Sequence, residues 1–416
     1  MAILGGGPIG LEAAFDGARR GYDVAVYEAG RVGEHLRRFA DVTLFTPFHM
    51  NASQAGRDRL REGAAAPPPD DAIVTAGELV GRYLEPLARL PELKGRIHER
   101  ARVEAVSREG LSKSEAIVAT GDDRRASRPF LLRVESSEGV SRYARADVVI
   151  DATGVYGQPR ATGPGGLRAL GEEALGARID RHIVSTRTAA RDRYARRRVL
   201  LIGDGHSAAT ALVDFAALAA EGEAPRVTWI RRARGSAPFH LQEKDPLPER
   251  ESLSRRANEI ASTAPWLTTL SGAVVEAYAT SAKEVQATVR DDRGASRGFA
   301  FDQILALVGY QPDSAIHREL QIHLCYASEG PMALSSALLA AASASPDAAG
   351  DCLKQTTHGP ATLRTPEPGY FLVGAKSYGR NPQFLLSLGH RQILDVFSLI
   401  EADRMATAGR APAPAR

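Results

Sequence analysis

The sequence contains little of what secreted, metal-binding or membrane proteins depend on. Only two of its 416 residues are cysteine, Cys325 and Cys352, which argues against a disulfide-stabilised secreted fold and against a cysteine-rich metal site. Neither a run of about 20 apolar residues for a membrane span nor an apolar signal region after Met1 is present. The net charge of +3 is too small to indicate a nucleic-acid partner. We therefore expect a cytoplasmic protein that binds neither membrane nor nucleic acid and holds no metal.

The length and the composition favour an enzyme over a small binding module. A chain of 416 residues exceeds one ordinary domain core, so two domains of normal size are expected. The apolar share of 44% and the charged share of 25% are typical of soluble globular proteins.

A glycine-rich turn follows the first apolar stretch. Residues 2–4 predict a short strand, residues 11–20 a helix and residues 22–28 a second strand. The turn fits the GxGxxG pattern, in which the glycines permit the turn, admit a pyrophosphate and allow close helix packing. Glu28 would bind ribose hydroxyls and repel a ribose phosphate, which suits FAD or NAD, although a solvated strand-end carboxylate is the alternative. The predicted contacts are Gly5, Gly7, Pro8, Ile9, Gly10 and Glu28.

The same pattern recurs over residues 198–230. Its turn has alanine in place of the third glycine, and arginines stand where the acidic residue of the first unit stood. Guanidinium groups match the oxygens of a ribose 2′-phosphate, so NADPH is preferred to NADH, while a solvated basic edge is the alternative. The predicted contacts are Gly203, Gly205, His206, Ser207, Ala208, Arg231 and Arg232.

Further motifs accompany the two turns. Ala152-Thr153-Gly154 follows an apolar strand, residues 309–312 read Gly-Tyr-Gln-Pro, and residues 370–400 predict a terminal strand and helix. With the glycine turns, they resemble a large group of flavoproteins that contains the thioredoxin-reductase-like enzymes and the flavin-containing monooxygenases. The resemblance covers roughly residues 2–400. It implies an α/β fold with two Rossmann-like, three-layer dinucleotide-binding domains, and it implies that the first dinucleotide is FAD.

The resemblance also implies the domain boundaries. Residues 1–165 and 300–402 would form a discontinuous FAD domain, into which residues 175–299 are inserted as the NAD(P)H domain. The end of the chain is rich in alanine and proline, so residues 403–416 are expected to form a disordered tail. The size and the resemblance are also compatible with a homodimer.

Several positions depart from the family pattern. No CxxC dithiol is present, and the Gly-Asp that binds the ribityl chain in such proteins is replaced by a sequence that ends in Lys376, which cannot accept a hydrogen bond. The monooxygenase signature FxGxxxH is echoed only by His182 and Tyr194, so we expect His182 to be an ordinary loop histidine. The additional FAD contacts that the resemblance implies are Ala152, Thr153, Gly154, Gly374, Lys376 and Asn381.

Three functions fit these motifs. The first is a monooxygenase that uses O2 to oxygenate a small substrate at nitrogen, sulfur or a carbonyl group, which the missing dithiol favours. The second is a reductase, in which Cys325 and Cys352 act as a redox pair or the flavin reduces an external disulfide directly. The third is a non-catalytic nucleotide sensor or a subunit that binds a protein partner. Besides the cysteines, His49 and Asn51 are candidate catalytic residues, because related enzymes bring this loop over the flavin; a plain surface loop is the alternative.

Overall fold

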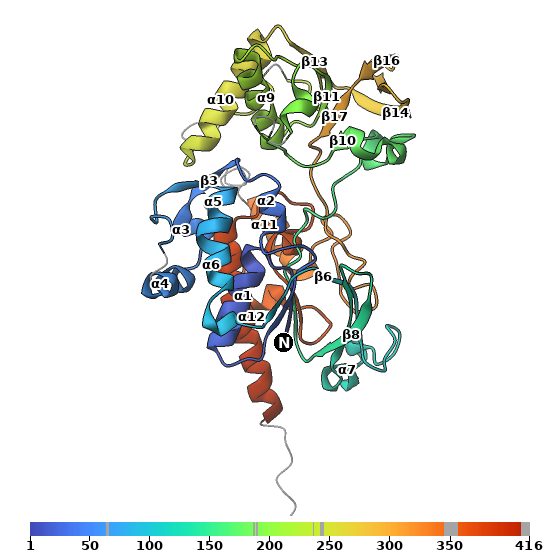
Figure 1. The fold of residues 1–416 in the computed structure, drawn as a ribbon. Helices are drawn as coiled ribbons and strands as arrows, with labels where there is room; N and C mark the ends of the chain where they lie inside the picture. Colours follow the sequence, from blue (N-terminus) through green and yellow to red (C-terminus); the bar gives the residue numbers. More distant parts are fainter. Residues whose placement is uncertain are drawn as a thin grey trace, which may run out of the picture.

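Two lobes, each built around a five-stranded parallel sheet, make up the chain (Figure 1). The computed structural model describes residues 1–63, 66–185, 188, 190–235, 237–241, 245–344 and 357–408. None of the described helices is both long enough and apolar enough to cross a membrane. Among the described residues, no group of three acidic, histidine or cysteine side chains is arranged to hold a metal ion.

The sheet of the first lobe joins strands that are distant in the sequence. Its order is β18 (Tyr370–Leu372), β9 (Val149–Asp151), β1 (Ala2–Leu4), β2 (Ala25–Tyr27) and β5 (Ile97–His98). All of its pairings are parallel. The strands are short and apolar and almost all their residues are buried, as expected for a parallel sheet covered on both faces. The loops that follow β1, β9 and β18 therefore meet at one edge of this sheet, which is where open α/β sheets bind ligands.

Two helices pack together in the first lobe. Helix α1 (Pro8–Arg19) begins with proline, which suits the first helical turn, and it packs against α12 (Leu386–Ala408). The end of α12 corrects the predicted tail. Residues 403–408 continue the helix, and Asp403 forms an ion pair of 2.8 Å with Arg364. Residues 409–416 lie outside the described residues.

The second lobe repeats the architecture of the first. Its parallel sheet has the order β10 (Ile179–Asp180), β17 (Gln303–Ala306), β11 (Arg198–Ile202), β12 (Arg226–Arg231) and β13 (Leu267–Ser271). Helix α9 (His206–Ala220) is rich in alanine, a strong helix former, and packs against α10 (Pro248–Thr263). Both tryptophans of the chain, Trp229 and Trp266, belong to this lobe.

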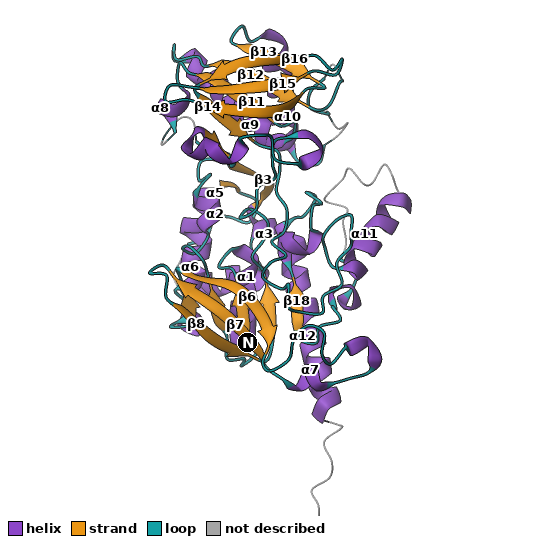
Figure 2. Ribbon diagram, turned by 90° about the vertical axis from the view of Figure 1, so that its right-hand side faces the viewer, coloured by secondary structure: helices purple, strands orange, loops and turns teal. Residues whose placement is uncertain are grey.

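Two three-stranded antiparallel sheets, one two-stranded antiparallel sheet and several short helices complete the lobes (Figure 2). One sheet of the first lobe contains β6 (Ala101–Arg108), β7 (Phe130–Ser136) and β8 (Ser141–Ala146), and the sheet of the second contains β14 (Val274–Thr280), β15 (Val285–Arg290) and β16 (Ser296–Phe301). The remaining strands and α-helices are β3 (Thr43–Pro47), β4 (Ile73–Thr75), α2 (Glu34–Arg37), α3 (Phe48–Asn51), α4 (Gln54–Glu62), α5 (Ala76–Leu79), α6 (Glu85–Ala88), α7 (Arg124–Ser127), α8 (Arg191–Tyr194) and α11 (Met332–Ala344).

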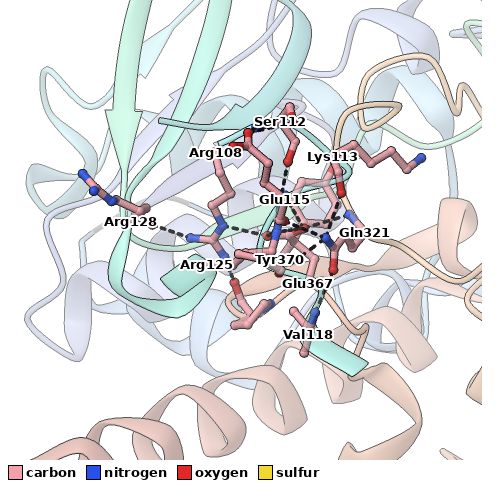
Figure 3. Close-up of polar contacts among 12 residues, drawn as sticks. Arg108, Ser112, Lys113, Glu115, Val118, Arg125, Arg128, Gln321, Glu367 and Tyr370 are labelled. Atoms are coloured by element: carbon pink, nitrogen blue, oxygen red, sulfur yellow. Dashed lines mark hydrogen bonds and ion pairs between the residues drawn. The ribbon is translucent and has the colours of Figure 1, made fainter. Parts of the chain in front are cut away.

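A buried ionic cluster links the β6–β8 sheet to the residues that precede β18 (Figure 3). The carboxylate of Glu367 accepts hydrogen bonds from Arg108 Nε at 2.7 Å and from Arg125 Nε at 3.0 Å, and all three side chains are almost completely buried. Backbone carbonyls take further guanidinium donors: Arg108 donates to Arg128 O at 2.6 Å, and Arg125 donates to Ser112 O at 3.0 Å. Two cations therefore share one carboxylate, and backbone carbonyl oxygens accept further hydrogen bonds from both guanidinium groups.

Two antiparallel segments connect the lobes. Pro159 and Tyr310 form an isolated antiparallel bridge, and the N–H of Arg160 donates to Gly309 O at 2.9 Å. The outgoing and the returning connection thus lie side by side, so the lobes are joined by a narrow, paired junction.

Candidate functional site

The first glycine turn has the geometry of a nucleotide cradle. Gly5 has a φ of +97°, and a Cβ there would lie 2.7 Å from the carbonyl oxygen of Ala152. A Cβ on Gly10 would overlap the carbonyl oxygen of Gly5, so these two glycines are required by close packing. Nothing lies within 4 Å of the corresponding position on Gly7, which caps α1 without a side-chain hydrogen bond. The start of α1 is therefore open to an anion such as a pyrophosphate.

Glu28 follows β2 directly and is held against this turn. Its Oε2 accepts a hydrogen bond from the Gly6 N–H at 2.6 Å, and its Oε1 accepts one from the Gly30 N–H at 2.7 Å. Burial raises the pKa of Glu28, and the two hydrogen bonds act against that rise. Each oxygen keeps acceptor capacity, so a fixed carboxylate is available for the hydroxyls of a ribose.

The second turn repeats the packing of the first. Gly203 has a φ of +132°, and a Cβ there would overlap the carbonyl oxygen of Leu307, whereas nothing lies within 4 Å of that position on Gly205. Ala208, the residue in place of the third glycine, is completely buried. His206 and Ser207 are exposed at the start of α9, which also lacks a side-chain cap. This turn offers a second helix N-terminus to an anion.

In both turns, the N–H of the first glycine donates a hydrogen bond to a carbonyl of the next strand along the chain. The Gly5 N–H donates to Tyr27 O at 2.8 Å, and the Gly203 N–H donates to Ile230 O at 3.1 Å. The residue after the acceptor is Glu28 in the first lobe and Arg231 in the second. Opposite charges thus occupy equivalent positions beside the two nucleotide cradles.

Arg231 and Arg232 differ in accessibility, which the sequence did not indicate. Arg231 is 3% exposed, its guanidinium lies 5.7 Å from the Trp229 ring centre, and its Nε has no hydrogen-bond partner among the described residues. Arg232 is exposed. Burying a cation without a partner costs free energy unless an anion neutralises it. Arg232 is exposed to solvent, so its charge carries no such cost.

A polar cluster around Asp151 fills the space below the first turn. Asp151 ends β9 and is fully buried; its Oδ2 accepts hydrogen bonds from Lys376 Nζ at 2.6 Å and from Tyr370 Oη at 2.8 Å. Thr153 donates to Oδ1 through its N–H at 3.1 Å and its hydroxyl at 2.7 Å, and His317 Nδ1 lies 3.8 Å from Oδ2. Burial alone would raise the pKa of Asp151, but the charges and hydrogen bonds of Lys376 and His317 together outweigh burial and lower it. The carboxylate is therefore ionised.

This cluster explains the departure at Lys376. The lysine is 1% exposed and points at Asp151 and at Thr153 Oγ1, 3.0 Å away, so its ammonium group has a carboxylate partner. Sequence reasoning did not identify Asp151, Tyr370 or His317. The available signal was a charge exchange: an acid directly before Ala152-Thr153-Gly154, and a base where the flavoproteins that the sequence resembles have an acid.

The remaining FAD candidates lie at the end of β18. Gly374 has a φ of +68°, and its N–H donates to Gln392 Oε1 at 2.8 Å. Asn381 Oδ1 accepts a hydrogen bond from the Gln383 N–H at 3.0 Å. Both residues belong to the connection from β18 to α12, so the structure brings this segment, the first turn and Ala152 to one sheet edge.

Among the described residues, the candidate catalytic residues His49, Asn51 and Cys325 form no hydrogen bond with one another. Asn51 is buried and donates to Thr46 O at 2.9 Å, while its Oδ1 accepts from the Thr46 hydroxyl at 2.8 Å, so its polar atoms shape its own loop. His49 is exposed, and its Nδ1 lies 2.9 Å from Asp70 O. Cys325 is buried, 4% exposed, and Cys352 lies outside the described residues.

His182 corrects a prediction, since it is not an ordinary loop histidine. It lies at the junction of the lobes, its ring stacks on Tyr310 with centres 5.4 Å apart, and its Nδ1 lies 3.1 Å from Tyr310 Oη. Arg38, which follows α2 of the first lobe, approaches His182 Nε2 at 3.5 Å. The sequence could not indicate this role, because the contacts join three segments far apart in the chain.

The sequence matches no protein-family model and no curated protein. The fold, however, is similar to that of bacillithiol disulfide reductase from Bacillus cereus, with a TM-score of 0.66 and 18% identity over 97% of this chain and 98% of that one. It is also similar to thioredoxin reductase from T. acidophilum (0.58, 16%, 96% and 98%) and to ornithine N-hydroxylase from Kutzneria sp. 744 (0.60, 16%, 97% and 99%). These likenesses confirm the predicted α/β fold with two Rossmann-like domains.

Proposed function

We propose that the chain is an oxidoreductase that binds FAD at the first glycine turn and NADPH at the second. The observation that carries this proposal is that an acid, Glu28, stands beside the first turn, whereas Arg231, at the equivalent position, and Arg232 stand beside the second turn of the same shape. A carboxylate suits the free ribose hydroxyls of FAD, whereas a guanidinium suits a ribose 2′-phosphate. NADH is the alternative nucleotide. The Kutzneria hydroxylase, whose structure is described with reduced FAD, NADP+ and L-ornithine, supports the assignment by its fold.

The residues of the first lobe fit FAD. Gly7 leaves room for the pyrophosphate, Glu28 would hold the ribose, and Ala152, Gly154 and the segment from Gly374 to Asn381 would line the flavin side. Lys376 would act indirectly, because its ammonium group fixes Asp151 and Thr153 at the end of β9. Bound FAD would supply the redox chemistry, namely electron transfer between NADPH and an acceptor.

The residues of the second lobe would bind and orient NADPH. The start of α9 would hold the pyrophosphate, and Arg232 would contact the 2′-phosphate because it is exposed. Phe45 of the first lobe contacts the His206 ring, with centres 5.5 Å apart, so the first lobe reaches the second cradle. That contact would help to exclude water where the two cofactors meet.

We further propose that the electrons go to O2 and that the protein is a monooxygenase acting on a small substrate at nitrogen, sulfur or a carbonyl group. The sequence has no CxxC pair, and Cys325 is buried. A dithiol relay of the usual kind is thereby excluded.

A disulfide reductase is the second candidate, and the similarity to bacillithiol disulfide reductase favours it. In that case the reduced flavin would transfer electrons directly to an external disulfide.

Oxygen and disulfide turnover distinguish the two candidates. The purified protein would be reduced with NADPH without oxygen, divided, and mixed either with 18O2 and a panel of amines, sulfides and ketones or with low-molecular-weight disulfides. Incorporation of 18O into one of the substrates supports the monooxygenase. Rapid thiol formation without 18O incorporation supports the reductase instead.

A further inference from the structure

A cavity of about 510 Å³ lies at the junction of the lobes. Arg38 of the first lobe and residues between 176 and 184 of the second lobe line it, and neither glycine turn contributes to its wall. The volume falls in the range that small-molecule sites occupy. The cavity is therefore large enough for a ligand other than the two nucleotides.

One cation facing this cavity has no acidic partner. Among the described residues, no carboxylate lies within ion-pair distance of Arg38. Its guanidinium group instead lies 3.5 Å from His182 Nε2. The other charged lining residues are engaged: Arg181 donates to Glu172 at 2.7 Å, and Asp180 accepts from Arg193 at 2.8 Å. The donors of Arg38 are thus available to an anion that enters the cavity.

The histidines beside the cavity add no charge. Arg38 can only donate, so His182 Nε2 accepts and Nδ1–H donates to Tyr310 Oη, which is 3.4 Å from Arg181 O. Burial and the charge of Arg38 lower the pKa of His182, and burial, Arg38 and His182 lower the pKa of His35 to about 4. Both imidazoles are neutral near pH 7, so among the described residues that line the cavity Arg38 is the one free cation.

Apolar side chains also contribute to the lining. Ile179 and Val184 line the cavity, and His182 presents a ring that stacks on Tyr310. We infer that the cavity is the substrate site and receives a small organic acid, whose carboxylate binds Arg38 while its apolar body contacts these side chains. The inference rests on the proposed function, because it names the substrate class of that enzyme.

Calorimetric titration of the full chain with benzoate and its neutral isostere benzamide tests this inference. We expect benzoate to bind at least tenfold more tightly than benzamide, since a charge-assisted hydrogen bond contributes about that much. Arg38→Met should weaken benzoate at least tenfold without changing benzamide, and Arg38→Lys should give an intermediate affinity. The control is Arg89→Met, which removes an exposed arginine paired with Glu85 and should leave both affinities unchanged.

Three results would overturn the inference: equal affinities for benzoate and benzamide, no effect of Arg38→Met, or displacement of benzoate by NADP+. The last result would assign the cavity to the nucleotide. Flavin reduction by NADPH is recorded on the same samples. If NADPH does not reduce the flavin, the proposed function is contradicted. The calorimetry tests the anion site independently of that result.

Discussion

Replacing Lys376 with methionine should destabilise the first lobe by about 3–5 kcal/mol, the usual cost of removing one partner from a buried ion pair. The ammonium group lies 2.6 Å from Asp151 and 3.0 Å from Thr153 Oγ1, and both charged side chains are at most 1% exposed. Without it, the fully buried carboxylate keeps the hydrogen bonds of Tyr370 and Thr153, with His317 Nδ1 3.8 Å away. The double substitution Lys376→Met with Asp151→Asn removes both charges and should restore most of the stability.

The two tryptophans make the effect measurable by lobe. Trp229 and Trp266 both belong to the second lobe, so tryptophan fluorescence during urea unfolding reports on that lobe, while far-UV circular dichroism reports on both. Lys376→Met should lower the urea midpoint of the circular dichroism signal and leave the fluorescence midpoint in place. The matched control Arg364→Met breaks the exposed pair with Asp403 and should cost less than about 1 kcal/mol.

The destabilisation caused by Lys376→Met should change with pH, and the direction follows from the pKa shift of Asp151. In the native protein Lys376 and His317 keep the pKa of Asp151 below its usual range, so the stability they contribute is fully present above the unfolded-state pKa and declines as the pH falls toward the native-state pKa. In Lys376→Met, burial would raise that pKa, and protonation of Asp151 relieves the penalty. The destabilisation should therefore shrink as the pH falls from 7 to 4. A cost below about 1 kcal/mol at pH 7, or a cost that grows with acid, would refute the reasoning.

Four further substitutions test other parts of the structure. Glu367→Gln should cost about 3 kcal/mol in urea unfolding, because it leaves two buried guanidinium groups without a counter-charge; an unchanged midpoint would contradict this. Gly10→Ala should abolish flavin binding through overlap with the Gly5 carbonyl, whereas Gly7→Ala should keep the thermal midpoint and lower only FAD affinity; equal flavin contents would be inconsistent with the cradle. His35→Asn should lessen the stability lost between pH 6.5 and about 4, where the unfolded state alone binds the proton, and identical acid titrations would argue against it.

The sequence was sufficient for the parts of the site that are local in the chain. Each glycine turn lies within one strand–turn–helix unit, so the spacing of Gly5, Gly7 and Gly10 predicted a cradle that the backbone forms. The equivalence of Glu28 and Arg231 also followed from position alone, because each directly follows the residue whose carbonyl accepts the hydrogen bond of the first glycine in its turn.

Contacts between distant segments could not be predicted in the same way. Lys376 meets Asp151 only because β18 pairs with β9, and His182 meets Arg38 only because the lobes approach each other at their junction. Neither pairing leaves a periodic pattern or a motif in the sequence. The burial of Arg231 likewise depends on Trp229 and on packing within the second lobe.

The most direct test of the account is flavin reduction in the purified protein and in Arg232→Gln, recorded by stopped-flow absorbance with NADPH and with NADH. The account predicts bound FAD, faster reduction by NADPH than by NADH, and a loss of about tenfold or more of that preference in Arg232→Gln, with the rate for NADH unchanged. Arg226→Gln, at the exposed start of β12, is the matched control and should keep the preference. Protein without FAD, or flavin that neither nucleotide reduces, would contradict the central claim.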